Sequence, residues 1–307
     1  MSRLAERLVE YLAVRRALGY KLDRAGRLLA QFVVYLDDAG VESFTVGDAI
    51  AWATLPAGGD RWWWAQRLSV VRGFAVWLHN LDPAVEVPPT DLLPARAPRA
   101  VPYLYSDQDI AALMNAAVTL RGHLRQVTYR IVIGLLAVTG MRVGEVIRLN
   151  QADIDLTDAT ITVRHTKFDK SRLLPLHSST TAVLGDYLAV RNRLCSQSVC
   201  PAVFVSPGGT RLLATNVEST FRIMVAHAGL KPRGAARPRL HDLRHSFIVR
   251  AVLAGYETGE DVQARLAVIS TYVGHVDPNA TYWYLSASPE LMAIAGQRLD
   301  AHLGGLR

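Results

Sequence analysis

Cysteine and long apolar runs are both scarce in this chain of 307 residues, and each scarcity excludes a class of protein. The two cysteines, Cys195 and Cys200, have no second Cys or His cluster nearby to complete a zinc site, so we interpret them as ordinary thiols in a reducing compartment. The longest apolar run, residues 131–138, is too short to span a bilayer. Residues 1–20 lack the continuous apolar core of a signal peptide. We therefore expect a cytoplasmic protein with no membrane partner.

Lysine is also rare, and arginine supplies most of the positive charge. Lys and Arg together number 34 against 27 for Asp and Glu, which gives a formal net charge of +7. Because the guanidinium group can pair with two phosphate oxygens at once, this balance favours a polyanionic partner such as nucleic acid. A solvated basic surface would have the same composition, and net charge alone does not separate the two interpretations.

The order of patterns along the chain predicts two domains joined by a linker. Apolar residues recur at helical spacing through residues 1–82, which we expect to form a helical domain. The segment 83–102 contains six prolines, a composition that forbids a helix and favours an extended linker. Residues 103–307 form the second predicted domain, in which helical patterns surround one hairpin, with strands at 160–165 and 172–176. A further short strand is predicted at residues 203–205.

A cluster of arginines and tryptophans follows a polar turn in the helical domain. Three consecutive tryptophans, residues 62–64, cannot all face the core from one helix, so at least one is exposed or lies at an interface. Packing explains most of this segment. Contact with a nucleic-acid backbone is the alternative for its arginines, which are Arg61, Arg67 and Arg72.

Histidine, arginine and tyrosine concentrate between residues 240 and 284. In the sequence HDLRH, His241 and Arg244 are three residues apart, so on a helix both project from one face and can hold one anion between them. The loop before this sequence, KPRGAARPR, is expected to contact a nucleic-acid backbone. Its basic residues are Lys231, Arg233, Arg237 and Arg239. After it, Asp277 and Pro278 predict the start of a short helix that carries Tyr282 and Tyr284, and a tyrosine there can serve as a nucleophile.

A second candidate anion site lies in the sequence TGMRVGEVIRL. Arg142 falls in the first turn of a predicted helix, where a cation is unfavourable unless an anion is bound there. Glu145, three residues along, is placed to orient Arg142 or a neighbour. Lys167 lies in the turn of the predicted hairpin, a position where lysines are usually only solvated.

Together these residues have the chemistry needed to cut and rejoin a phosphodiester. The two arginines can neutralise the non-bridging oxygens, and Tyr284 can attack phosphorus to give a covalent phosphotyrosine. Lys167 can protonate the departing sugar oxygen, while His241 and His275 position or shuttle protons. The sequence shows no carboxylate or Cys/His cluster of the kind that a metal nuclease uses, so we expect neither a metal ion nor another cofactor.

The order of these elements resembles the tyrosine recombinase, or phage integrase, family. The resemblance rests on TGMRVGEVIRL, a lysine in a hairpin that ends RLLPL, HDLRHSF, VGH and a tyrosine nine residues after that histidine. It covers nearly the whole chain and implies a fold that is mainly α with a small β-sheet: an N-terminal helical core-binding domain and an α+β catalytic domain. The catalytic set that it implies is Arg142, Lys167, His241, Arg244, His275 and the nucleophile Tyr284, with Glu145 in support.

The resemblance implies site-specific exchange of DNA strands through a 3'-phosphotyrosyl intermediate. The partners would be double-stranded DNA and further copies of the chain in a homo-tetramer, alone or with other recombinases. A recombinase carried by a mobile element is favoured over one that resolves chromosome dimers.

Several alternatives stay open at the level of sequence. Lys170 lies in the same turn as Lys167, and Tyr282 competes with Tyr284, although the spacing from His275 favours Tyr284. A DNA-binding accessory protein that no longer cleaves is one alternative function. A type IB topoisomerase is another, because it uses the same covalent chemistry without strand exchange.

Overall fold

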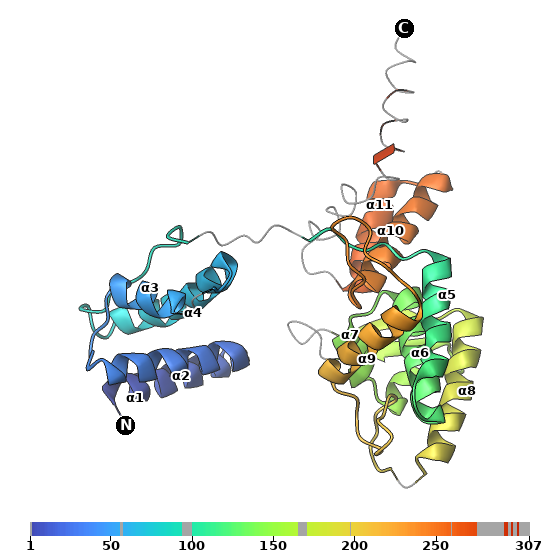
Figure 1. Ribbon diagram of the computed structural model, residues 1–307, viewed down its shortest axis with the longest axis horizontal. Helices are drawn as coiled ribbons and strands as arrows, with labels where there is room; N and C mark the ends of the chain where they lie inside the picture. The colour runs from blue at the N-terminus through green and yellow to red at the C-terminus, as the bar shows by residue number, and fades with distance from the viewer. Residues whose placement is uncertain are drawn as a thin grey trace. The chain divides into compact units, whose positions relative to one another are not determined.

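The computed structural model describes residues 2–55, 58–93, 100–164, 171–196, 198–258 and 260–274, together with residues 292, 293, 296 and 300. By its contacts the chain divides into two compact units, residues 1–99 and 100–307 (Figure 1). Helices dominate both units, and the sheet among the described residues has three strands. The fold class predicted from the sequence, mainly α with a small β-sheet, is therefore confirmed.

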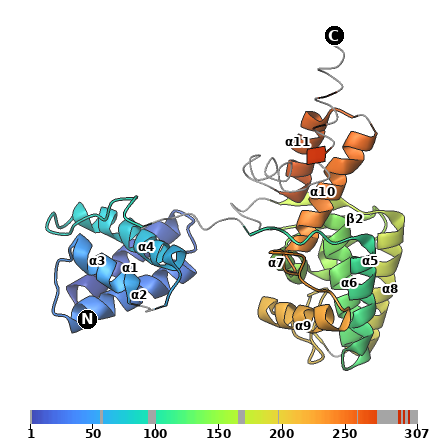
Figure 2. The same cartoon turned by 45° about the horizontal axis from the view of Figure 1, so that its top comes forward.

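The first unit is built from helices that begin at polar caps. Its helices are α1 (Arg3–Ala17), α2 (Asp23–Asp38), α3 (Val46–Thr54) and α4 (Arg61–His79), seen from two directions in Figures 1 and 2. The side chains of Ser2, Thr45 and Asp60 accept hydrogen bonds from backbone amides in the first turns of α1, α3 and α4. Such caps satisfy amides that have no partner within the helix, and they fix where each helix begins.

Aromatic side chains form the centre of the first unit. The Phe32 ring lies 5.0 Å from the ring of Phe44 and 5.1 Å from that of Trp52, between centroids. The apolar residues that helical spacing predicts to face inward from α2 and α4 are all buried, which confirms the predicted faces. They are Leu28, Leu29, Phe32, Val33, Leu36, Leu68, Val71, Phe74 and Leu78. Trp62 is 36% exposed, as the run of three tryptophans requires.

Arg67 belongs to this core rather than to the surface. Only 8% of the residue is exposed, and its guanidinium carbon lies 3.7 Å from the centre of the Trp52 ring. One guanidinium nitrogen donates a hydrogen bond to the Trp52 carbonyl at 2.7 Å. The prediction that Arg67 contacts a nucleic-acid backbone is corrected by this geometry, because an apolar and aromatic setting has taken the side chain out of solvent. Arg61, one helical turn and a half earlier, is exposed.

We expect Arg67→Ala to reduce the free energy of unfolding by about 2 kcal/mol, because it removes a buried stem, a ring contact and the partner of a carbonyl. Arg61→Ala, on the exposed start of the same helix, should change it by less than about 0.5 kcal/mol. Urea unfolding of both variants checks the prediction. Equal stabilities would show that Arg67 is not a core residue.

The start of the predicted linker packs against the first unit. Val85 is fully buried, and the Glu86 amide donates a 3.0 Å hydrogen bond to the Phe44 carbonyl. Arg72 donates to the carbonyls of Pro88 and Pro89 at 2.7 and 2.6 Å. The absence of proline amides does not matter here, since proline carbonyls still accept. Residues 85–89 thus pack on the helices of the first unit, and two of the three guanidinium nitrogens of Arg72 donate to this segment.

In the second unit, one helix lies at the centre and contacts several others. Its helices are α5 (Asp107–Ala116), α6 (His123–Thr139), α7 (Val143–Arg148), α8 (Ser178–Leu194), α9 (Ala214–His227), α10 (Asp242–Glu257) and α11 (Val262–Val273), with short 3-10 turns η1 (Ala117–Thr119) and η2 (Gln151–Asp153). Helix α6 contacts α5, α7, α8 and α10, and α10 and α11 lie side by side (Figures 1 and 2). Within the described residues no helix is both long and apolar enough to cross a membrane.

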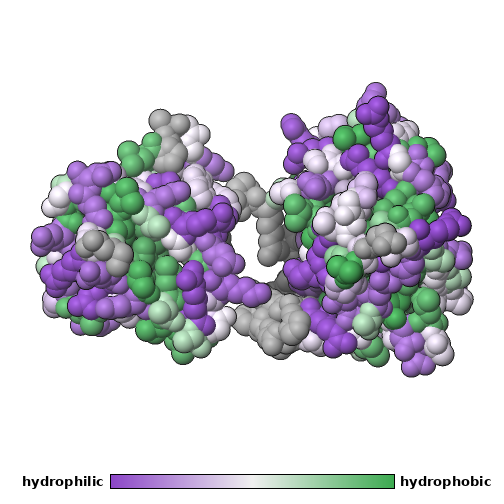
Figure 3. All heavy atoms as spheres, turned by 90° about the horizontal axis from the view of Figure 1, so that it is seen from below, coloured by the Kyte–Doolittle hydropathy of each residue, from purple (hydrophilic) through white to green (hydrophobic). Residues whose placement is uncertain are grey.

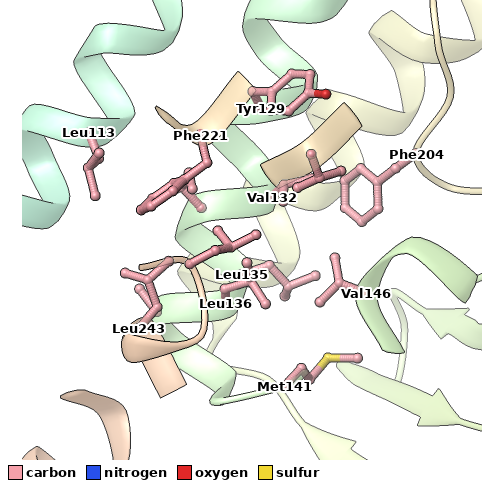
Figure 4. Close-up of a cluster of buried hydrophobic side chains, with 14 of the residues drawn as sticks. Leu113, Tyr129, Val132, Leu135, Leu136, Met141, Val146, Phe204, Phe221 and Leu243 are labelled. Atoms are coloured by element: carbon pink, nitrogen blue, oxygen red, sulfur yellow. The ribbon is translucent and has the colours of Figure 1, made fainter. Parts of the chain in front are cut away.

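The core of the second unit lies around α6, as the close-up in Figure 4 shows. Val132 and Leu136 of α6 are buried, at 0% and 2% exposure, with Val146 of α7 and Leu243 of α10 also at 0%. Because α7 and α10 carry the predicted site residues, this apolar cluster sets their positions.

On the faces visible in Figure 3, hydrophilic side chains surround smaller hydrophobic areas on each unit.

The three strands form an antiparallel sheet in chain order, β1 (Ile154–Asp155), β2 (Thr160–Val163) and β3 (Arg172–Pro175). Ile161 pairs with Leu174, and Val163 pairs with Arg172 at the turn end of the hairpin. The predicted hairpin is present. The strand predicted at 203–205 is not, because this segment makes only isolated bridges, such as Val205 with Arg211. Its apolar side chains are buried in the core without extending a ladder.

Candidate active site

Arg142 sits at the N-cap of α7, and Glu145 in the first turn holds it there. The Glu145 carboxylate accepts one hydrogen bond from the Arg142 amide and one from its guanidinium, both at 2.9 Å. This reciprocal arrangement stabilises the helix start and the orientation of the arginine. The remaining terminal nitrogen of Arg142 donates to the Gly274 carbonyl at 3.1 Å. The Arg142 side chain stays 37% exposed, so it can still meet a ligand.

Arg172 shares the Glu145 carboxylate with Arg142, a role that the sequence did not indicate. Its two terminal nitrogens lie 3.2 and 2.9 Å from the two Glu145 oxygens. Burial of Glu145 alone would raise its pKa, but the hydrogen bonds and charges of Arg172 and Arg142 outweigh this, so the pKa of the carboxyl lies below its usual value. Glu145 is therefore ionised near neutral pH. The available signal was the place of Arg172 at the hairpin end, next to the predicted lysine turn.

Arg244 is almost completely buried, with 2% of the residue exposed. It projects from the first turn of α10 and donates to the Gly140 carbonyl and to the Val273 carbonyl, each at 2.8 Å. A buried charge is stable only when its donors are satisfied. These bonds therefore fix the guanidinium between the loop that precedes Arg142 and the end of α11.

His241 is the N-cap residue of α10, where it makes no side-chain capping hydrogen bond and is exposed, while the next residue, Asp242, is buried. Although the residue as a whole is exposed, partial desolvation of its imidazole, followed by the charge of Arg244, lowers the pKa of His241, and the Asp242 carboxylate acts in the opposite direction. The imidazole is thus neutral near pH 7. Asp242 is fully buried and accepts two hydrogen bonds from Arg239 at 2.9 Å and one from the Tyr103 amide at 3.1 Å. It ties the first residues of the second unit to this helix start.

The structure thus brings together four of the predicted site residues: Arg142, Glu145, His241 and Arg244. The other catalytic predictions, Lys167, His275 and Tyr284, lie outside the described residues, as do the alternatives Lys170 and Tyr282. The hairpin turn precedes Arg172, and His275 follows Gly274, whose carbonyl accepts from Arg142.

The basic loop before α10 divides into two kinds of residue. Arg233 makes two bonds to Asp109, at 2.9 and 2.8 Å, and Arg239 pairs with Asp242. Both are exposed at the residue level but have structural partners. Lys231 and Arg237 are exposed, and neither pairs with an acidic residue among those described. Contact of this loop with DNA stays a prediction, and these two side chains are the most available for it.

Gly140 turns the chain between α6 and Arg142, with φ of +60°, and a side chain there would collide with Phe247 at 2.4 Å. We expect Gly140→Ala to lower the free energy of unfolding by about 1–3 kcal/mol, from left-handed strain and this collision. Gly122→Ala is the matched control, because Gly122 has φ of +86° and open space around it. Thermal unfolding separates the two effects. A loss no larger than that of Gly122→Ala would contradict close packing of this loop on α10.

Comparison with known proteins identifies related sequences and related folds. The Phage integrase family model matches residues 103–290. The chain is 42% identical over 309 residues to the "Putative integrase/recombinase y4rB" of Sinorhizobium fredii, with 98% of each chain covered. It is 28% identical over 291 residues to tyrosine recombinase XerD of Neisseria meningitidis serogroup A, with 92% of each covered.

Solved structures share the fold at low sequence identity. The integrase of transposon Tn1549, in complex with transposon right end DNA, matches with a TM-score of 0.68 at 15% identity, over 98% of this chain and 100% of that one. XerA recombinase matches with a TM-score of 0.52 at 24% identity, over 95% and 96%. The family match covers the unit that contains Arg142, Glu145, His241 and Arg244 in the arrangement described above. The chain belongs to the phage integrase family of tyrosine recombinases, enzymes that break and rejoin DNA.

Proposed function

We propose that this recombinase cleaves DNA by attack of the Tyr284 hydroxyl on a phosphodiester. A Tyr284 oxygen–phosphorus bond forms, the bond from phosphorus to the 5' oxygen breaks, and a 3'-phosphotyrosyl link with a free 5' hydroxyl results. The Tyr284 proton passes to a histidine, and Lys167 protonates the departing oxygen. Attack by the 5' hydroxyl of another strand reverses each step and joins the exchanged strands.

The observation that carries this proposal is the convergence of Arg142 and Arg244 on adjacent carbonyls, those of Gly274 and Val273. Two guanidinium groups held from separate segments are prepared to stabilise the negative charge that develops on the phosphate oxygens. Loss of one such preorganised donor typically slows an enzyme by about 10²–10³-fold. The lowered pKa of His241 supports a part in proton transfer, since a neutral imidazole can accept a proton at pH 7.

We also propose that the substrate is a specific site in duplex DNA and that the active assembly is a homo-tetramer, alone or with a related recombinase. Lambda integrase has been solved as a tetramer bound to a Holliday junction, and the Tn1549 integrase bound to transposon DNA. These neighbours support a recombinase of a mobile element. Residues 1–82 would bind DNA, residues 83–102 link, and residues 103–307 catalyse. Arg61, Lys231 and Arg237 are the exposed side chains that we expect to contact the DNA backbone.

A strand-exchange assay tests the function. Two plasmids that carry the flanks of the protein's own gene are incubated with the protein in excess EDTA, and recombinant joints are sequenced. We expect joints at one defined position that depend on both sites. Relaxation of supercoiled plasmid without any site, and no joints, would favour the topoisomerase alternative. DNA binding without cleavage, even with an added partner recombinase, would favour the accessory protein.

A further inference from the structure

Three successive carbonyls at the end of α11 each accept a hydrogen bond from a different arginine. Arg172 donates to Tyr272 at 2.9 Å, Arg244 to Val273 at 2.8 Å and Arg142 to Gly274 at 3.1 Å. The last carbonyls of a helix lack partners within it and lie at the negative end of its dipole. Guanidinium groups are therefore well suited to this end. Arg142 and Arg244 are predicted catalytic residues. Arg172 was not among the predicted site residues.

Every nitrogen of the Arg172 guanidinium is engaged with protein groups. Nε donates to the Tyr272 carbonyl, and the two terminal nitrogens pair with the two oxygens of Glu145. The side chain is 14% exposed, against 37% for Arg142, which shares the same carboxylate. Arg172 therefore faces the protein, whereas Arg142 retains a solvent-accessible edge. The engagement of all three of its nitrogens with protein groups, rather than its low exposure, argues against Arg172 as a contact of the phosphate.

Gly274 leaves room for Arg172. A side chain at Gly274 would begin 2.9 Å from a terminal nitrogen of Arg172, and the residue has φ of +70°. The guanidinium thus packs directly on the backbone where the chain continues into His275. Arg172 therefore contacts both the Glu145 carboxylate, which orients Arg142, and the end of α11, which leads to the predicted catalytic residue His275.

We propose that Arg172 is a positioning residue for DNA cleavage, acting through Glu145 on Arg142. The inference rests on the proposed catalytic role of Arg142. It also has an electrostatic consequence. The charged groups that face Glu145 in the described residues are Arg142, on its own helix, and Arg172, on β3. Removing Arg172 raises the pKa of Glu145. The carboxylate is then protonated at a higher pH than in the wild type, and its ion pair with Arg142 is lost at that higher pH.

The test uses the full chain and a nicked duplex that traps the covalent adduct, at saturating DNA. We expect Arg172→Gln to slow adduct formation by about 10–100-fold, the usual effect of losing a group that orients a reactive one, with DNA affinity within about 3-fold of wild type. The rate should fall on the acid side at a higher pH than for wild type. Arg172→Lys should recover part of the rate. Arg164→Gln, directly after β2 in the same hairpin, where Arg164 pairs with Asp153 at 2.6 Å instead of with Glu145, is the matched control and should cleave normally.

A double-mutant cycle separates positioning from an independent role. If Arg172 acts through Glu145, then Arg172→Gln combined with Glu145→Gln should cleave no more slowly than about the slower single variant, and the acid-side shift should disappear. Additive losses, or an unshifted pH profile for a folded Arg172→Gln, would overturn the inference. If Arg172→Gln does not fold, the same cycle with Arg172→Lys decides.

Arg142→Ala distinguishes this inference from the proposed function. Wild-type cleavage by Arg142→Ala would refute the proposed catalytic role of Arg142, and the Arg172 inference with it. An inactive Arg142→Ala beside a fully active Arg172→Gln would refute only the inference.

Discussion

Arg244→Ala should show the largest combined loss of stability and activity among the described residues. Its removal leaves the carbonyls of Gly140 and Val273 without their donor in a site where the arginine is only 2% exposed. We expect the free energy of unfolding to fall by on the order of 3 kcal/mol. The rate of covalent adduct formation should fall at least about 10²–10³-fold, because a preorganised donor to the phosphate is lost.

Arg244→Lys separates the two losses. An ammonium group keeps the charge but cannot direct donors to two carbonyls and a phosphate oxygen together. We therefore expect it to recover part of the stability and little of the cleavage. Arg250→Ala is the matched control on the same helix, since Arg250 pairs with Asp107 and with the Ala137 carbonyl, away from the Arg142 and α11 contacts. Urea unfolding and adduct rates at saturating DNA are measured for all three. Wild-type cleavage by folded Arg244→Ala would refute its catalytic role.

Local patterns were enough to predict most elements of this fold. Helical spacing through residues 1–82 predicted a helical first domain, and the structure shows helices there that bury Phe32 and Phe74. The hairpin followed from its two-residue period. Each of these features depends on residues close in sequence. Residues 203–205, where only Val205 forms an isolated bridge, were wrongly predicted to be a strand, because burial and strand pairing produce the same apolar run.

The partners of the arginines could not be predicted in the same way. Arg142 meets a carbonyl 132 residues away, and Arg172 meets one 100 residues away, so no local pattern indicates either contact. DNA contact was the alternative interpretation for Arg67 and its neighbouring arginines, yet the guanidinium of Arg67 lies over the Trp52 ring. The type of a basic residue does not reveal whether its side chain contacts a phosphate, a carboxylate or an aromatic ring. The catalytic positions were predictable only from the order of several motifs.

Tyr284→Phe is the second prediction with a large effect, because the hydroxyl is the proposed nucleophile and a phenyl ring has no oxygen to replace it. We expect complete loss of SDS-resistant protein–DNA adducts with DNA affinity unchanged within about 3-fold, since a single hydroxyl contributes little to binding that phosphate contacts dominate. Tyr282→Phe is the matched control. It removes the same atom from the same short segment and should leave adduct formation intact.

The most direct measurement is to digest the wild-type adduct with protease and nuclease and to locate the nucleotide on the remaining peptide by mass spectrometry. The proposed mechanism predicts a 3'-linked nucleotide on the oxygen of Tyr284, formed in EDTA and absent from Tyr284→Phe. A nucleotide on Tyr282 would move the nucleophile by two residues. A 5' linkage, or adducts that persist in Tyr284→Phe, would contradict cleavage by Tyr284.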